Sequence, residues 1–128
     1  MTSPTISVGV PCYNKAAFVT RCLSSLQRQR SVSFEVIVVD DCSSDDSRPC
    51  AKAPAAADSR IRVIENKGNL GPSGTFNVAL SESRVPWFML VSADDYAADN
   101  AAFEAQLRAA LEHNCTEQCA RRSARGRC

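Results

Sequence analysis

The chain has 128 residues, enough for one domain with a single core. It is 45% hydrophobic and 23% charged, and its formal net charge is +1, so charge gives no argument for binding nucleic acid or an anionic membrane surface. The opening residues MTSPTISVGVPCYNK lack the basic and apolar regions of a secretory signal, and no apolar stretch approaches the roughly 20 residues that span a bilayer. We therefore expect a cytoplasmic protein, with no nucleic-acid partner and no membrane span in this chain.

Strand-like and helix-like segments alternate from the start of the chain. Residues 5–10 are a β-branched run that we expect to stop at Pro11, which predicts a first strand. Residues 34–39 predict a second strand, continuous rather than alternating, as expected when both faces are buried in a parallel sheet. Between them, apolar residues at helical spacing predict one apolar stripe, which consists of Val19, Cys22, Leu23 and Leu26.

A second helix is predicted over residues 43–58. Ser44 is a suitable N-cap, and Asp45 and Asp46 are favoured in the first turn by the helix dipole. Two prolines, Pro49 and Pro54, should make this helix short or broken.

The next segments continue the alternation. Residues 61–65 predict a third strand, 66–73 a glycine-containing turn, 74–82 a helix that presents Phe76, Ala79 and Leu80, and 87–91 a fourth strand. Asp99 can cap a final helix whose shared apolar face consists of Phe103, Leu107, Ala110 and Leu111. Strand and helix repeated in this way predict an α/β fold, with a doubly wound, mainly parallel sheet.

The last segment, residues 115–128, departs from this pattern. It contains four arginines and three cysteines but no Leu, Ile, Val or aromatic residue, so it cannot supply a core element. A basic tail that contacts a phosphate-bearing partner is one interpretation; a disordered end, produced by a truncated gene or a shifted reading frame, is the interpretation we favour. The seven cysteines of the chain include no CxxC pair, so we expect free thiols rather than a zinc site or a disulfide framework.

Polar segments follow all four predicted strands: PCYN, DDCSSDD, ENKGNLGPSG and SADD. In an open parallel sheet, ligands bind beyond the carboxyl ends of the strands, at a topological switch point. Two acidic clusters on strand ends suggest Mg²⁺ or Mn²⁺, which prefer carboxylate oxygens. For DDCSSDD, a helix cap with a solvated first turn is an equally good explanation. In SADD, capping by Asp99 leaves Asp94 and Asp95 unexplained, which favours a functional role.

In order and spacing, the segments PCYN, VVDDCSSDDS, NLGPSGTFNVAL and SADD resemble the family 2 glycosyltransferases, which have the GT-A fold. The resemblance covers residues 5–114 and implies an incomplete nucleotide-sugar-binding domain over 1–114. The implied donor is a nucleotide-diphospho-sugar, with a UDP-sugar favoured, and the acceptor could be a saccharide, a lipid or a protein.

The resemblance also implies roles for individual residues. The base would lie against Pro11 and Tyr13, where an aromatic ring offers a stacking surface, beside Asn14 of the same motif. An aspartate would accept a hydrogen bond from the base imide or the ribose, with Asp41 as first choice and Asp40 as second.

The SADD segment resembles the family's DxD motif, with Ser92 at its first position. Asp94 and Asp95 would then share the contacts to Mg²⁺ or Mn²⁺ and to the ribose. Asn77 matches a common family asparagine, although an exposed helix residue explains it equally well. Phe76 stands where members often carry an arginine, so a diphosphate contact from that position is lost.

No catalytic residue can be assigned, because the general base of the family is expected beyond the end of this chain. His113 lies on the last predicted helix, away from the strand ends. We therefore expect a donor-binding half that does not transfer sugar efficiently. A non-catalytic nucleotide-binding remnant is the alternative. A receiver-type Mg²⁺-binding signalling domain is disfavoured because no aspartate ends the third strand, and a dehydrogenase because no GxGxxG follows the first.

Overall fold

A computed structural model describes residues 6–29, 33–85 and 87–94. It contains, in chain order, β1 (Ile6–Cys12), α1 (Val19–Gln27), β2 (Phe34–Asp40), α2 (Ser47–Ala57), β3 (Ile61–Glu65), α3 (Gly71–Glu82) and β4 (Trp87–Leu90). The predicted alternation of strands and helices is confirmed. The predicted helix that starts near Asp99, and the tail at 115–128, lie outside the described residues.

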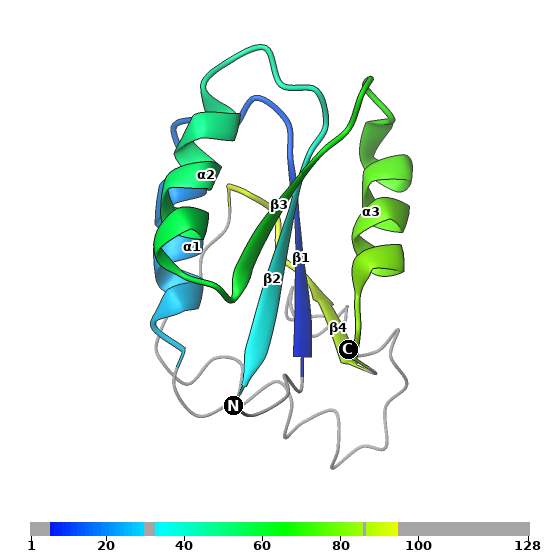
Figure 1. The fold of residues 1–128 in the computed structure, drawn as a ribbon. Coiled ribbons are helices and arrows are strands. Elements are labelled where there is room, and N and C mark those ends of the chain that lie inside the picture. The colour runs from blue at the N-terminus through cyan, green and yellow to red at the C-terminus, as the bar shows by residue number, and fades with distance from the viewer. Residues whose placement is uncertain (1–5, 30–32, 86, 95–128) are drawn as a thin grey trace.

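The described strands form one four-stranded sheet in the order β3-β2-β1-β4. All three neighbouring pairs are parallel. The chain therefore winds from β1 outward through β2 to β3 and then returns across the sheet to place β4 on the other side of β1. Helices α1 and α2 cover one face of the sheet and α3 covers the other (Figure 1). This is the predicted doubly wound arrangement, and its switch point lies between β1 and β4.

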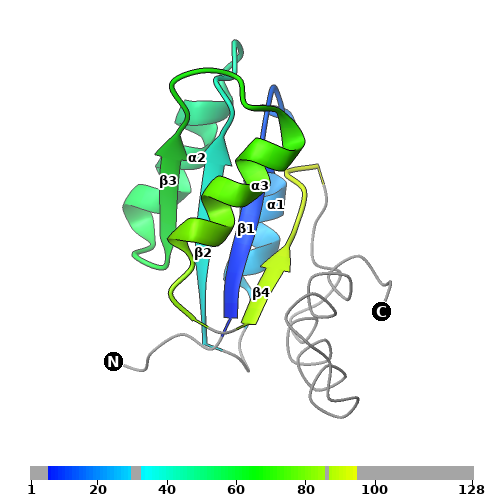
Figure 2. The same ribbon diagram turned by 90° about the vertical axis from the view of Figure 1, so that its right-hand side faces the viewer.

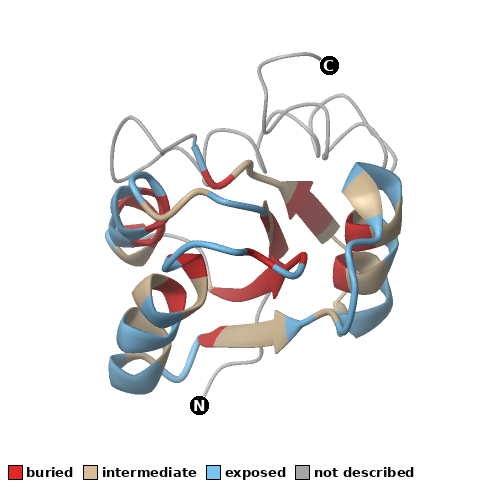
Figure 3. Cartoon of the chain, turned by 90° about the horizontal axis from the view of Figure 1, so that it is seen from above, coloured by how far each residue is buried: buried red, intermediate tan, exposed pale blue. Residues whose placement is uncertain are grey.

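The core has two parts, one on each face of the sheet. The larger cluster joins alternate residues of the central strands, such as Val36 and Val38, to the apolar stripe of α1. The smaller one places Ile37 and Val39 with Ala79 and Phe88. Every residue of β2 is buried, as its continuous apolar pattern predicted, and the central strands appear as buried segments between the two helix layers (Figure 3).

A glycine in β1 permits close packing on the α3 side. A Cβ atom added at Gly9 would lie 2.5 Å from the ring carbon Cζ of Phe88 and 3.1 Å from Cβ of Ala79. Real Cβ atoms essentially never approach another atom to 2.5 Å, so a larger residue at this position would require the Phe88 ring or its neighbours to shift. The absence of a side chain here determines how near α3 and Phe88 come to the centre of the sheet.

Strand β1 runs one residue past Pro11, so the predicted stop there is wrong. The amide of Asp41 donates to the carbonyl of Cys12, which therefore points towards β2. Backbone groups alternate in direction along a strand, so those of Pro11 point to the β4 side, where pairing has already ended at Gly9. A missing N–H costs no ladder bond at that place.

Helix α2 begins at Ser47, four residues later than predicted, and is continuous through Pro54. Neither Ser44 as N-cap nor acids in the first turn is confirmed, because Asp46 occupies the N-cap position and the first turn holds no acid. The physical reason is that Asp45 accepts hydrogen bonds from the amide and the hydroxyl of Ser47, at 2.9 and 2.5 Å. Such local side-chain bonds compete with helix formation and keep the preceding residues in a loop.

Helix α3 begins at Gly71 rather than at residue 74. Pro72 fits the first turn of a helix, where its missing N–H has no intrahelical partner in any case. The amides of Leu70 and Gly71 both donate to the carboxylate of Asp41. Asp41, which follows β2, therefore caps this helix together with Asn69, whose side-chain oxygen also accepts the amide of Gly71 at 3.2 Å.

Candidate functional site: the carboxyl edge of the sheet

The loops that follow β1, β2 and β3 and the residues after β4 meet at one edge of the sheet, the carboxyl edge (Figure 2). Register places the strand ends side by side, since Cys12 pairs with Asp40 and Asp40 pairs with Glu65. The parallel sheet thus brings together the polar segments that are distant in the sequence.

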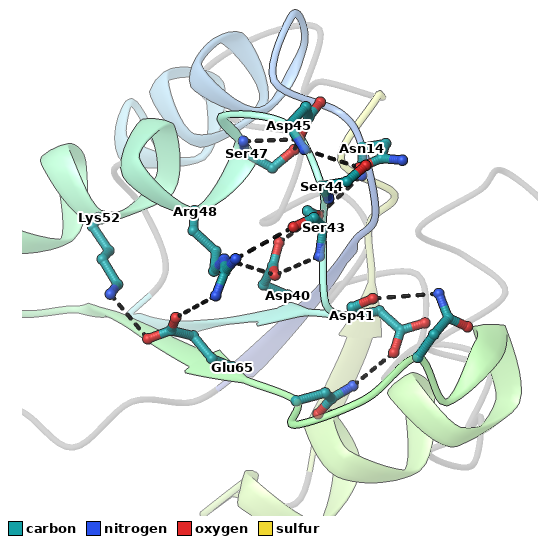
Figure 4. Close-up of polar contacts among 12 residues, drawn as sticks. Asn14, Asp40, Asp41, Ser43, Ser44, Asp45, Ser47, Arg48, Lys52 and Glu65 are labelled. Carbon is teal, nitrogen blue, oxygen red and sulfur yellow. Dashed lines mark hydrogen bonds and ion pairs between the residues drawn. The ribbon is translucent and has the colours of Figure 1, made fainter.

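Asn14 ties the loop after β1 to the loop after β2. Its side-chain oxygen accepts hydrogen bonds from the backbone amide of Ser44 at 2.8 Å and from that of Asp45 at 3.4 Å, and the backbone N–H of Asn14 donates to the hydroxyl of Ser43 (Figure 4). Its φ angle is 52°, a left-handed conformation that asparagine tolerates better than most residues. The side chain of Asn14 is thus engaged within the protein.

Tyr13 is one of the few large apolar side chains that remain open at this edge. Tyr13 is 48% exposed, and Pro11, two residues earlier in the chain, is half-buried. An exposed aromatic ring beside a topological switch point is a suitable surface for a planar base. The exposure of Tyr13 leaves its ring accessible, and its contact with a base stays a prediction.

Asp40 is buried at the end of β2 and is fully engaged by its own chain. One carboxylate oxygen accepts the hydroxyl of Ser43 at 2.6 Å, and the other accepts the amide of Ser43 at 3.0 Å. Arg48 places Nε 3.6 Å from the second oxygen and also pairs with Glu65 at 3.3 Å (Figure 4). Asp40 therefore compensates the charge of Arg48 and fixes the loop after β2.

The side chain of Asp41, unlike that of Asp40, contacts the start of α3. Its carboxylate accepts the amide of Leu70 at 2.7 Å, the amide of Gly71 at 3.0 Å and the side-chain amide of Asn66 at 3.0 Å. Burial alone would raise the pKa of this carboxyl, but these hydrogen bonds, with one from Thr75, outweigh it and hold the pKa below its usual value. The carboxylate is ionised at neutral pH and its acceptor positions are used within the protein.

Asp94 follows β4 and faces solvent, with its side chain 44% exposed. Its Oδ1 accepts the hydroxyl of Ser92 at 2.6 Å, and its Oδ2 lies 3.5 Å from Nζ of Lys15. The hydrogen bond from Ser92 and the charge of Lys15 lower the pKa of Asp94 despite some opposing desolvation. An ionised, accessible carboxylate is thus available at the switch point.

The donor set at this edge is compatible with a magnesium or manganese ion that is completed by a ligand. Among the described residues, no group of three or more Cys, His, Asp or Glu side chains could hold a metal by itself. In nucleotide sites, Mg²⁺ is held by only one or two carboxylates together with substrate phosphates. Asp94 can supply one such carboxylate. Asp95, the predicted second carboxylate, lies outside the described residues.

Among the described residues that the sequence proposed for the site, Asn77 lies away from the carboxyl edge. It is exposed on α3, six residues after Gly71 and so about 9 Å along the helix axis from the helix start. The first turn of α3, rather than its middle, lies at the carboxyl edge.

Comparison with known proteins identifies the family. Residues 7–127 match the family described as "Glycosyl transferase family 2". The chain belongs to glycosyl transferase family 2. It is 36% identical over 97 residues to the teichoic acid poly(glycerol phosphate) polymerase of Staphylococcus epidermidis, an alignment that covers 75% of this chain and 14% of that protein.

Solved structures agree with this assignment. The fold of this family 2 chain is similar to S. aureus TarS 1-349 in complex with UDP-GlcNAc, with a TM-score of 0.74 and 31% identity over 86% of this chain and 32% of that one. It also matches the fold of the mannosyltransferase PcManGT from Pyrobaculum calidifontis in complex with GDP-Man and Mn²⁺, with a TM-score of 0.76, 21% identity, and coverage of 84% and 32%. The GT-A fold expected from the motifs is confirmed, and the chain spans a third or less of each of these proteins.

Sequence reasoning missed two cations at the edge of this family 2 chain. Lys15 pairs with Asp94, and Arg48 pairs with Asp40. The sequence did carry a signal for Lys15, which directly follows the PCYN motif. It carried no signal for Arg48, because the partner of Arg48 depends on where α2 begins.

Among the described residues, the cysteines form no disulfide. Burial raises the pKa of the Cys12 thiol to about 11, although the Ser47 hydroxyl opposes the shift. A neutral thiol is a poor nucleophile and a poor metal ligand, so Cys12 does not add thiolate chemistry to this edge at neutral pH. In the described part of the chain, the helices are too short or too polar to cross a bilayer.

Proposed function

We propose that this chain binds the nucleotide-diphospho-sugar donor of a transferase that moves the sugar to an acceptor hydroxyl. The carrying observation is that the exposed ring of Tyr13 and the ionised carboxylate of Asp94 lie at the same switch point of a family 2 chain. An aromatic ring can stack on the base of a nucleoside diphosphate, and a carboxylate can hold a divalent ion together with its phosphates. The UDP-GlcNAc complex of the similar TarS structure supports a UDP-sugar as the donor.

The base would stack on Tyr13 beside Pro11, with Asn14 shaping the loop that carries both. Asp94 and Asp95 would hold Mg²⁺ or Mn²⁺, and the Mn²⁺ complex of the similarly folded mannosyltransferase supports that choice of ion. When bound, the ion would neutralise the charge that develops on the diphosphate leaving group.

Of the two aspartates after β2, Asp41 stays our first choice for the base imide or the ribose and Asp40 our second. Either contact has to share a carboxylate that already accepts hydrogen bonds from its own chain. Asn77 would reach the ligand only if the ligand extends along α3. The general base is unassigned.

We assign residues 1–114 to a donor-binding domain and 115–128 to a basic tail, in a cytoplasmic setting. The acceptor, whether saccharide, lipid or protein, would bind residues outside this donor site. The chain by itself is then expected to bind the donor without efficient transfer. A non-catalytic nucleotide-binding remnant would give the same fold and the same donor site.

Calorimetric titration of UDP into the chain, with and without Mn²⁺, tests the donor site. We expect binding below millimolar concentration that depends on Mn²⁺ and that Asp94→Asn weakens at least tenfold, or about 1.4 kcal/mol. Asp46→Asn is the matched control, because Asp46 is exposed beside α2 and its side chain does not cap that helix. Absence of UDP binding at several millimolar ligand would exclude the donor site. Sustained sugar transfer by the chain alone would refute the assignment of donor binding without catalysis.

A further inference from the structure

Lys15 is the cation nearest to the proposed metal-binding carboxylate among the described ion pairs. Its Nζ lies 3.5 Å from Oδ2 of Asp94, and the two side chains are 38% and 44% exposed. The contact joins the loop after β1 to the residues after β4, across the switch point where the strand order reverses.

The backbone of Lys15 is held by a hydrogen bond to the loop after β2, whereas its side chain is partly exposed and contacts Asp94 alone among the described ion pairs. Its amide donates to the hydroxyl of Ser47 at 2.8 Å, and the amide of the preceding Asn14 donates to Ser43 at 3.0 Å. The loop is thereby fixed to the loop after β2. A long, partly exposed stem on a fixed backbone lets the ammonium move between positions at little cost.

The two carboxylate oxygens of Asp94 contact two different residues of the chain. Ser92 occupies Oδ1 through a 2.6 Å hydrogen bond, and Lys15 faces Oδ2. The hydroxyl of Ser92 is neutral and orients the carboxylate, whereas the ammonium of Lys15 carries the charge that a metal ion would bring. An arriving cation therefore has to replace Lys15 and can leave Ser92 in place.

We propose that Lys15 is a positioning residue that competes with the divalent cation for Asp94. This inference rests on the proposed function, in which Asp94 holds that ion. In the metal-free chain the ammonium balances the carboxylate. When the ion binds, the ammonium is displaced towards solvent or towards an anionic ligand. Lys15 thus lowers the affinity of the chain for the metal alone, and it opposes loading of the site before the donor arrives.

The size of the effect follows from the geometry. An exposed ion pair contributes little, and a nearby ammonium repels a divalent ion in the same site, so removal of the charge should tighten binding about three- to tenfold. Salt screens both contributions, and the difference should shrink in roughly 1 M salt, where the Debye length is about 3 Å.

The test is a titration of the full 128-residue chain with Mn²⁺, without nucleotide and at low ionic strength, with free Mn²⁺ followed by electron paramagnetic resonance. Lys15→Met keeps the length of the stem and removes the charge; Lys15→Arg keeps the charge. Lys52→Met is the matched control. Lys52 on α2 pairs with Glu65 on β3 and not with Asp94. Circular dichroism checks that each variant is folded.

We expect Lys15→Met to bind Mn²⁺ three- to tenfold more tightly, and both Lys15→Arg and Lys52→Met to bind like the unchanged chain. In an Asp94→Asn background, Lys15→Met should have no effect, which a merely structural role of the lysine would not produce. Equal Mn²⁺ affinity of Lys15→Met and the unchanged chain would overturn the inference and leave the donor site intact. Failure of every variant to bind Mn²⁺ or UDP would instead overturn the proposed function together with it.

Discussion

Replacing Asp41 with asparagine tests whether this carboxylate anchors α3. The two backbone amides that it accepts, from Leu70 and Gly71, lie at the start of the helix and have no partner within it. Asparagine keeps the shape but removes the charge, and its NH₂ group cannot accept either amide. Hydrogen bonds to charged groups contribute about 1.5–3 kcal/mol each and neutral ones about 1 kcal/mol, so we expect the substitution to lower the free energy of unfolding by about 2–4 kcal/mol.

Urea unfolding at pH 7 without ligand measures this loss. With a slope of about 2 kcal/mol per molar urea, the midpoint should fall by about 1–2 M. Asp46→Asn makes the same chemical change five residues away on an exposed residue and should leave the midpoint nearly unchanged. If both variants unfold at the same urea concentration, the anchoring role of Asp41 is refuted.

The same comparison has a pH dependence of known sign. The pKa of Asp41 is lower in the folded chain than the ordinary value of about 3.9 in the unfolded chain. Its contribution to stability is therefore complete above about pH 5, and it is lost as the pH falls through the folded pKa. The gap in unfolding free energy between the unchanged chain and Asp41→Asn should narrow below about pH 4. A gap that stays constant down to pH 2 would contradict the argument.

Two further predictions concern the packing of the sheet and the base-stacking surface. Gly9→Ala should lower the free energy of unfolding by about 1–3 kcal/mol through overpacking, whereas Gly68→Ala, where an added Cβ meets nothing within 4 Å, should change it by less than about 1 kcal/mol. Equal urea midpoints for the two alanine variants would contradict the close packing at β1. Tyr13→Ala should weaken UDP binding about tenfold and Tyr13→Phe should not, while Phe18→Ala, on a similarly exposed ring, should leave the calorimetric affinity unchanged. An unaltered affinity of Tyr13→Ala would remove the ring from the proposed donor site.

Elements whose residues carry a local pattern were predictable. The continuous burial of β2 and the apolar stripe of α1 follow from spacing alone, because hydrophobic periodicity is a property of neighbouring residues. The starts of α2 and α3 were not predictable in the same way. The start of α2 depends on Asp45, whose carboxylate accepts the amide of Ser47. The start of α3 depends on Asp41, whose carboxylate accepts the amide of Leu70, 29 residues later in the sequence.

The candidate site divides along the same line. The sequence placed Tyr13 and Asp94 at strand ends, and the parallel sheet brings those ends to one edge. It could not distinguish the two aspartates after β2, which point to different partners: Asp40 to Arg48 and Asp41 to the start of α3. Adjacent residues in an extended segment face opposite sides, and only the packed helices decide what each side contains.

By itself, the sequence determined the α/β alternation, the doubly wound sheet and the gathering of polar motifs at its carboxyl edge, since these depend on patterns read over a few residues. Only the tertiary structure decided which charges meet there. Lys15 and Asp94 lie near opposite ends of the described sequence, and they pair because β4 returns beside β1. Ion pairs and helix caps of this kind depend on distances between elements, which a local pattern does not contain.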